Sequence, residues 1–147
     1  MSYSLIDRGE VLELFISIKG SSSRTSKSSI DMDKDGVVGD KFYAKELDRS
    51  VLISSIDSYL LAKESSIDMS YGSLGENIVM DYNPYSLPTG TKIKIGEVIL
   101  EISQHCTLCK SLTKVDSKLP KLLKDDRGLF AKVIKSGTIY RGDKVYI

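Results

Sequence analysis

The sequence predicts a mainly β fold, a barrel or sandwich with short accessory helices, in a single domain over residues 1–147. Three observations support this prediction. Short runs rich in β-branched residues recur with turn residues between them, several runs alternate apolar and polar side chains, and helical periodicity is confined to two places. A chain of this length buries roughly two-thirds of the surface that its unfolded form exposes, so it can form its own core.

The first predicted strand reads EVLELFISI, and its alternation places four aliphatic side chains on one face. These are Leu12, Leu14, Ile16 and Ile18. The serine-rich tract that follows, residues 19–29, has no apolar side chain to bury and is predicted to be a loop. Such a loop is either a solvated tether or a cradle of hydroxyl groups and cations for an anion.

Two further strands are predicted at residues 48–55 and 76–81. Between them, Ser54 or Ser55 can cap a short amphipathic helix. Its periodic residues are Ile56, Tyr59, Leu60 and Lys63. Residues 90–103 predict a β-hairpin, because alternating aliphatic residues flank a two-residue Gly-Glu turn.

A second short helix is predicted in residues 117–128, with Pro120 in its first turn and Gly128 closing it. Its apolar side holds Leu119, Leu122 and Leu123. Two strands are predicted to end the chain.

The charge balance argues against several classes of function. Lysine and arginine number 21 and aspartate and glutamate 20, which leaves a net charge of +1 and no global attraction for nucleic acid. No stretch has the length and hydropathy of a membrane span, and the first ten residues lack the features of a signal peptide. We therefore expect a cytosolic protein that acts on neither nucleic acid nor a membrane.

The stretch DMDKDG, residues 31–36, matches the opening of a calcium-binding EF-hand loop. The twelfth position of such a loop supplies a bidentate carboxylate, and here it is Phe42. The stretch also follows a serine tract instead of a helix. We expect an acidic turn and no calcium.

Both cysteines and the only histidine lie within five consecutive residues, His105 to Cys109. A structural zinc site needs four ligands, and the chain has no other cysteine or histidine to complete one, so we expect no zinc. A thioredoxin-like dithiol belongs at the start of a helix after a strand, whereas CTLC follows a hairpin. Cysteines that serve only in packing are the remaining alternative.

Five segments point to a family. DGVVGDKF, RSVLIS, GSLGENIVMD, LPTGTKIKIGEVILEISQHCTLC and RGLFAKVIKSGTIYRGDKV occur in an order and spacing that resemble the MOSC domain, the module named after the C-terminal part of molybdenum cofactor sulfurases. The resemblance covers residues 10–147, and the segments around GENIV and PTGTKIKIG are its most specific parts. It implies a MOSC-type β-barrel, similar to that of pyruvate kinase, with two or three short helices.

The resemblance also implies one important cysteine, which aligns with Cys109. In the family the equivalent thiolate binds the molybdenum of a pterin cofactor, or is proposed to carry a persulfide received from a pyridoxal-phosphate-dependent cysteine desulfurase. A thiolate suits both roles, because it is a soft ligand and a nucleophile. Cys106 falls where the family does not require sulfur, and it is expected at most to protect or resolve an oxidised Cys109.

Basic residues are implied for the phosphate of the cofactor. Lys41 stands where cofactor-binding relatives carry a basic residue, and Arg49 and Lys19 are further candidates for charge-assisted hydrogen bonds. Small bacterial members often have histidine or arginine after the Gly-Asp pair, whereas this chain has Phe42 and Tyr43 in the corresponding stretch.

Four polar residues complete the implied site. Asn77 can offer a donor and an acceptor to the pterin edge, and Glu76 can fix its loop or accept from a pterin N–H. Thr107 and His105 lie beside the cysteines in the sequence and can bond oxo groups of the metal or shuttle a proton.

Two functions follow from the resemblance. The first is a molybdenum-dependent reductase of small N-hydroxylated compounds, which needs an electron-donor reductase as partner because the sequence has no flavin, haem or iron–sulfur signature. The second is a sulfur carrier that receives its persulfide from the desulfurase. A module that only binds or stores the cofactor is a third possibility.

Overall fold

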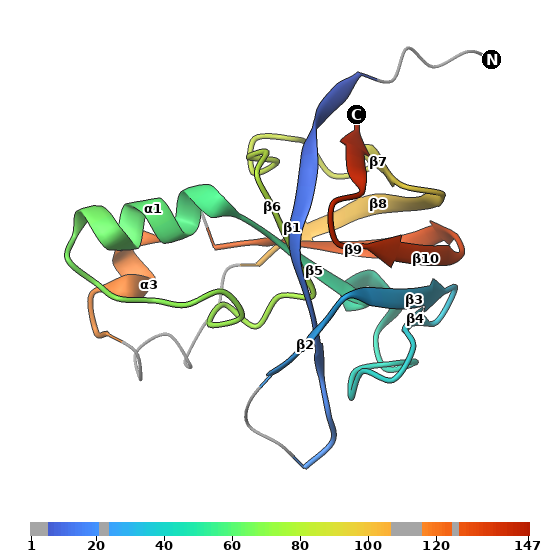
Figure 1. Cartoon of the computed structure of the whole chain (residues 1–147), viewed down its shortest axis with the longest axis horizontal. Coiled ribbons are helices and arrows are strands. Elements are labelled where there is room, and N and C mark those ends of the chain that lie inside the picture. Colours follow the sequence, from blue (N-terminus) through green and yellow to red (C-terminus); the bar gives the residue numbers. More distant parts are fainter. Residues whose placement is uncertain (1–5, 21–23, 107–115, 125–126) are drawn as a thin grey trace.

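The structure, a computed structural model, describes residues 6–20, 24–106, 116–124 and 127–147. In this part of the chain, eight strands form one sheet in the order β11-β7-β8-β9-β5-β6-β1-β2, and β11 also pairs with β1. That pairing closes seven of the strands into a barrel and leaves β2 on its outer edge (Figure 1). The predicted mainly β fold is confirmed.

The strands of this sheet are β1 (Asp7–Ser17), β2 (Arg24–Lys27), β5 (Val51–Ser55), β6 (Ile78–Met80), β7 (Lys92–Ile95), β8 (Val98–His105), β9 (Leu129–Lys135) and β11 (Lys144–Tyr146). A smaller sheet has the order β10-β3-β4. Its strands are β10 (Gly137–Tyr140), β3 (Ser29–Asp33) and β4 (Gly36–Val37). The short helices are the 3-10 turn η1 (Leu47–Arg49), α1 (Ile56–Glu64) and α3 (Leu119–Leu122).

The hairpin of β7 and β8 is confirmed as predicted, with its turn at Gly96 and Glu97. The aliphatic residues that alternate along it are almost fully buried and form part of the barrel core. They are Ile93, Ile95, Val98, Leu100 and Ile102. Alternation therefore identified the inner face of these strands correctly.

The predicted inner face of β1 is partly wrong. Its pairing with β6 shifts register between Val11 and Glu13, as a β-bulge does, so Val11 enters the barrel core in place of Leu12. Leu12 packs instead against a second apolar cluster outside the barrel. Ile18 lies beyond the end of β1 and is 46% exposed.

The prediction that residues 19–29 form only a loop is also wrong. Arg24–Lys27 is the edge strand β2, which pairs antiparallel with β1, and Ser29 begins β3. The sequence of β2 shows no hydrophobic pattern, because three of its four side chains are exposed and the strand is held by backbone pairing with β1 and by polar contacts.

The two predicted helices pack together on the outside of the barrel (Figure 1). The side chain of Ser55 caps α1 by accepting from the backbone N–H of Asp57, as the sequence suggests. The buried face of α1 differs from the predicted one: Tyr59 and Ala62 are buried, and Leu60 is 47% exposed. Among the described helices, none is long and apolar enough to span a membrane.

Helix α3 begins near Pro120 as predicted but ends at Leu122, so Gly128 does not close it. Gly128 instead precedes β9, where the backbone N–H of Cys106 donates to its carbonyl oxygen. Leu119 and Leu123 of the helical segment are buried against the cluster that also holds Phe15 and Tyr59.

Candidate functional site

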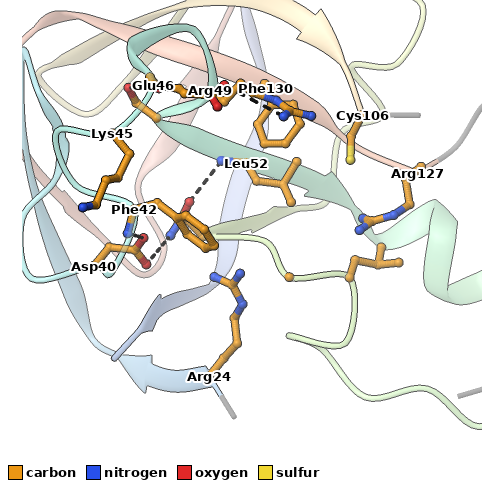
Figure 2. Close-up of a pocket in the computed structure, with 14 residues that line it drawn as sticks. Arg24, Asp40, Phe42, Lys45, Glu46, Arg49, Leu52, Cys106, Arg127 and Phe130 are labelled. Atoms are coloured by element: carbon orange, nitrogen blue, oxygen red, sulfur yellow. Dashed lines mark hydrogen bonds and ion pairs between the residues drawn. The ribbon is translucent and has the colours of Figure 1, made fainter. Parts of the chain in front are cut away.

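A pocket of about 350 Å³ opens beside the barrel (Figure 2). Its walls come from β2, the segment from Asp40 to Leu52, the loop of residues 74–77, and the chain where β8 ends and β9 begins. These segments are distant in sequence, and the closure of the barrel brings them together. The volume lies within the range of small-molecule and cofactor sites, roughly 300–1,000 Å³.

Cations outnumber carboxylates among the described residues that line the pocket. Four of them are basic: Arg24, Lys45, Arg49 and Arg127. The two acidic ones are Asp40 and Glu46. The pocket is therefore suited to an anion even though the whole chain is nearly neutral.

Arg24 reaches the pocket from β2, where it pairs with Ser17 of β1. Its guanidinium lies against Gly75, where an added Cβ atom would stand 3.2 Å from Nη2. Burial lowers the pKa of Arg24, and the charges of Asp40 and Glu76 oppose that effect. A partly desolvated guanidinium of this kind interacts more strongly with an anion than a solvated one does.

Asn77 and Asp40 form one wall of the pocket and are both buried. The Asn77 side chain accepts from the N–H of Leu52 at 3.0 Å and donates to the carbonyl of Phe15 at 3.1 Å. It also donates to Asp40 Oδ1 at 3.3 Å. Asn77 is thus at the pocket as expected, but its amide is committed to the fold, and these contacts give it a structural role.

Glu76 is fully buried behind this wall and is not among the lining residues. Its Oε2 accepts hydrogen bonds from the hydroxyl groups of Ser54, at 2.6 Å, and of Tyr59. Burial and the Glu76 charge raise the pKa of Tyr59, so this phenol stays a donor. Two roles were expected for Glu76, fixing its loop or accepting from a pterin N–H. Its hydrogen bonds within the protein support the first.

The cysteine region is described only in part. Cys106 is 6% exposed and lines the pocket, on the side of Arg127 (Figure 2). His105, the last residue of β8, is exposed and is not among the lining residues. Cys109 and Thr107 lie outside the described residues. The end of β8 thus brings Cys106 to the pocket.

The three basic residues implied by the resemblance are placed differently. Arg49 lines the pocket. Lys41 is exposed and does not line the pocket, but its Nζ atom lies 5.1 Å from the ring centroid of the lining residue Phe42. Lys19 is exposed beyond the end of β1 and is not among the lining residues.

Several lining residues were not identified from the sequence. Arg24 was not named because it lies in the serine-rich tract, for which an anion cradle was one of two predicted roles. Arg127 and Phe130 flank the start of β9, and Cys106 was expected to be a bystander. A basic residue beside a strand end is a signal, but too common a one to select Arg127 without the fold.

No cluster of three or more potential metal-binding side chains (His, Cys, Asp, Glu) occurs in the part of the chain that the structure describes. The acidic turn after β3 is held by its own contacts: Asp33 accepts from the Asp35 N–H at 2.8 Å and from the Tyr43 hydroxyl at 2.6 Å. The aspartates of DMDKDG therefore serve a turn that supports the pocket segment.

The chain is thus a small closed β-barrel with a cationic side pocket that Cys106 lines. Residues 19–146 match the MOSC domain family, and the chain belongs to that family. The family is associated with the molybdenum cofactor. The resemblance noted in the sequence is confirmed.

Solved structures share the fold. YuaD from Bacillus subtilis superposes with a TM-score of 0.84 at 18% sequence identity, covering 99% of this chain and 97% of that one. YiiM from Geobacillus stearothermophilus gives a TM-score of 0.68 at 15% identity, covering 97% of this chain and 75% of that one. YiiM from Escherichia coli gives 0.69 at 17% identity, with coverages of 94% and 69%. No curated protein matches in sequence.

Proposed function

We propose that this MOSC protein acts in the cytosol, binds a molybdenum–pterin cofactor in the arginine-lined pocket, with Cys109 as the thiolate ligand of the metal, and reduces N-hydroxylated compounds. One observation carries the proposal: Arg24, Arg127 and Cys106 line the same pocket. Cys109 follows the pocket residue Cys106 by three positions in the sequence.

The donor set fits the cofactor. Arg24 and Arg127 offer guanidinium groups to a phosphate, which planar forks of N–H donors bind well. Leu52 and Leu74 give the pocket apolar walls, against which a flat pterin can pack. Asn77 and Glu76 keep those walls in place through the hydrogen bonds that they make within the protein.

When bound, the cofactor supplies the chemistry of taking an oxygen atom from the substrate, with electrons from an external donor. The protein chain itself binds the cofactor and orients it. The cations stabilise a thiolate ligand and the phosphate, and the apolar walls exclude water from the neighbouring space. A separate electron-donor reductase is then the required partner.

The second candidate is a sulfur carrier, in which Cys109 holds a persulfide delivered by a pyridoxal-phosphate-dependent cysteine desulfurase. The cationic pocket favours it as well, because positive charge stabilises a persulfide anion as it stabilises a thiolate. The two candidates differ in what the purified protein carries.

Metal analysis and intact mass decide between them. Protein purified from a host that makes the cofactor should contain molybdenum near one equivalent under the first proposal. Under the second it should carry one extra sulfur atom that dithiothreitol removes. Cys109→Ser should abolish either signal and Cys106→Ser should leave it. The reverse pattern would assign the site to Cys106, and absence of both signals from the wild type would overturn both proposals.

A further inference from the structure

Two phenylalanine rings stand at the mouth of the pocket, each beside a cation. The Nζ atom of Lys41 lies 5.1 Å from the ring centroid of Phe42, and the guanidinium carbon of Arg49 lies 4.8 Å from that of Phe130. Phe42 is 48% exposed although it lines the pocket. A ring left half in water at the edge of a cavity offers its surface to a ligand.

The cations of the pocket fall into two groups by exposure. Arg127 is 7% exposed and Arg24 is half-buried, whereas Lys45 and Arg49 are exposed at the mouth. In Figure 2, Lys45 lies on the side of the pocket opposite Arg127, Arg49 lies beside Phe130, and the ring of Phe42 lies between Lys45 and the guanidinium of Arg24. The proposed cofactor uses the inner pair, so the outer group remains for a second ligand.

The mouth favours a negative ligand. Lys45 and Arg49 line it, and Lys41 lies against the lining residue Phe42. The lining carboxylate on this side is Glu46, whose Oε2 lies 3.9 Å from Arg49 Nη1. The carboxylate of Asp40 is occupied: it accepts backbone N–H groups at 2.7 and 3.0 Å and the Asn77 amide. Positive charge next to aromatic faces suits a flat anion.

We propose that this mouth selects the substrate, a flat aromatic compound that carries a carboxylate or another anionic group. Its ring packs against Phe42 and Phe130, and its anion pairs with Lys45 and Arg49. The inference rests on the proposed function for the reacting N-hydroxyl group, whereas recognition of a flat anion rests on the mouth alone. It also gives a role to Phe42, where the chain departs from relatives with histidine or arginine.

Calorimetric titration of the purified protein tests the proposal, with the molybdenum content of each sample recorded. The probes are 2-naphthoate, which is flat and anionic, 2-naphthylmethylammonium, which is flat and cationic, and cyclohexanecarboxylate, which is anionic but not flat. We expect 2-naphthoate to bind about tenfold more tightly than either of the others. Equal affinities for the three would overturn the proposal.

Variants of the residues at the pocket mouth test where 2-naphthoate binds. Phe42→Leu keeps an apolar side chain without the ring and should weaken 2-naphthoate about 3- to 10-fold. Lys45→Gln should weaken it about 2- to 5-fold. Lys121→Gln, the same change on the exposed surface of α3, should leave it unchanged.

Arg24→Gln separates this inference from the proposed function. It should lower the retention of molybdenum and leave the 2-naphthoate affinity unchanged. If Arg24→Gln weakens 2-naphthoate as much as Lys45→Gln does, the anion lies deep in the pocket and the inference fails. If the wild type holds no molybdenum while the three probes are ranked as expected, the cofactor proposal fails and the selective mouth stands.

Discussion

The side-chain amide of Asn77 donates a hydrogen bond to the buried carboxylate of Asp40, with 3.3 Å between Nδ2 and Oδ1. Asp40 also accepts from the N–H groups of Ser17 and Phe42, and Asn77 accepts from that of Leu52. One pair of side chains therefore joins the end of β1, the segment after β4 and strand β5. These hydrogen bonds hold together the wall of the pocket that Asp40, Leu52 and Asn77 line.

Asn77→Ala should destabilise the protein strongly. It leaves the N–H of Leu52, the carbonyl of Phe15 and the carboxylate of Asp40 without the amide, in a buried place. We expect the free energy of unfolding to fall by about 2–4 kcal/mol, measured by urea denaturation. Asn83→Ala removes only part-buried contacts, to Asp57 and Tyr85, and should cost less. Equal losses would contradict the role of Asn77.

Gly75→Ala should disturb the anion site itself. Gly75 has φ of +81°, and an added Cβ would lie 3.2 Å from Arg24 Nη2. Gly90→Ala is a matched control, because Gly90 has φ of +90° and nothing within 4 Å of its added Cβ. Both changes should cost about 1–2 kcal/mol of stability, since L-residues avoid this backbone region.

Only Gly75→Ala is expected to lower molybdenum retention and the affinity for inorganic phosphate, because only it displaces Arg24. Molybdenum content and phosphate titration measure the two effects. If Gly90→Ala lowers both to the same degree, the loss comes from reduced stability and Arg24 does not bind the anion.

How much of this fold could be predicted depends on where the hydrophobic signal lies. The β7–β8 hairpin was predicted down to its turn, because the buried aliphatic residues from Ile93 to Ile102 alternate with residues that are not buried. β2 was missed because edge pairing with β1 needs no apolar side chain. The bulge near Val11 was missed because the sequence does not record a register shift in a pairing between distant strands.

The lining of the pocket likewise contains residues that a local motif predicts and residues that only the folded barrel brings together. Asn77 and Arg49 were found through local motifs, and the structure places both at the pocket. Arg24 and Arg127 are more than a hundred residues apart, and only barrel closure makes them neighbours of one cavity. The hydrogen bonds of Asn77 show that a residue found through a motif also holds a wall of the pocket together.

Tyr59→Phe should destabilise the loop behind the pocket. It removes one of the two hydroxyl donors to Glu76 Oε2 and leaves Ser54 alone on that oxygen. The other oxygen, Oε1, has no hydrogen-bond partner among the described residues, so the carboxylate is poorly compensated. We expect a loss of about 1–3 kcal/mol in the free energy of unfolding.

Tyr71→Phe is the control for this change. The Tyr71 ring packs edge-on against Tyr59 with centroids 4.8 Å apart, and the phenylalanine keeps that contact. The hydroxyl donors to Glu76 among the described residues are Ser54 and Tyr59, so removing the Tyr71 hydroxyl should change the free energy of unfolding little. A loss as large as that of Tyr59→Phe would show that the effect of removing a tyrosine hydroxyl here does not depend on the hydrogen bond to Glu76.

Tyr43 links stability to pH at both ends of the range. Its hydroxyl donates to Asp33 Oδ2 at 2.6 Å. This bond is the main cause that lowers the pKa of Asp33, and it raises the pKa of Tyr43 to about 12. The Asp33 contribution is therefore complete above about pH 4 and is lost as pH falls through its lowered pKa. The Tyr43 contribution is complete below about pH 10 and is lost as pH rises towards 12.

Tyr43→Phe should remove this dependence. The stability difference between wild type and variant should be constant across the neutral range and shrink in strong acid and strong alkali, measured by urea denaturation at a series of pH values. A difference that stays the same from acid to alkali would contradict the assignment. Because Tyr43 holds the segment that carries Phe42 and Lys45, the variant should also weaken 2-naphthoate at neutral pH, where the hydrogen bond is intact in the wild type.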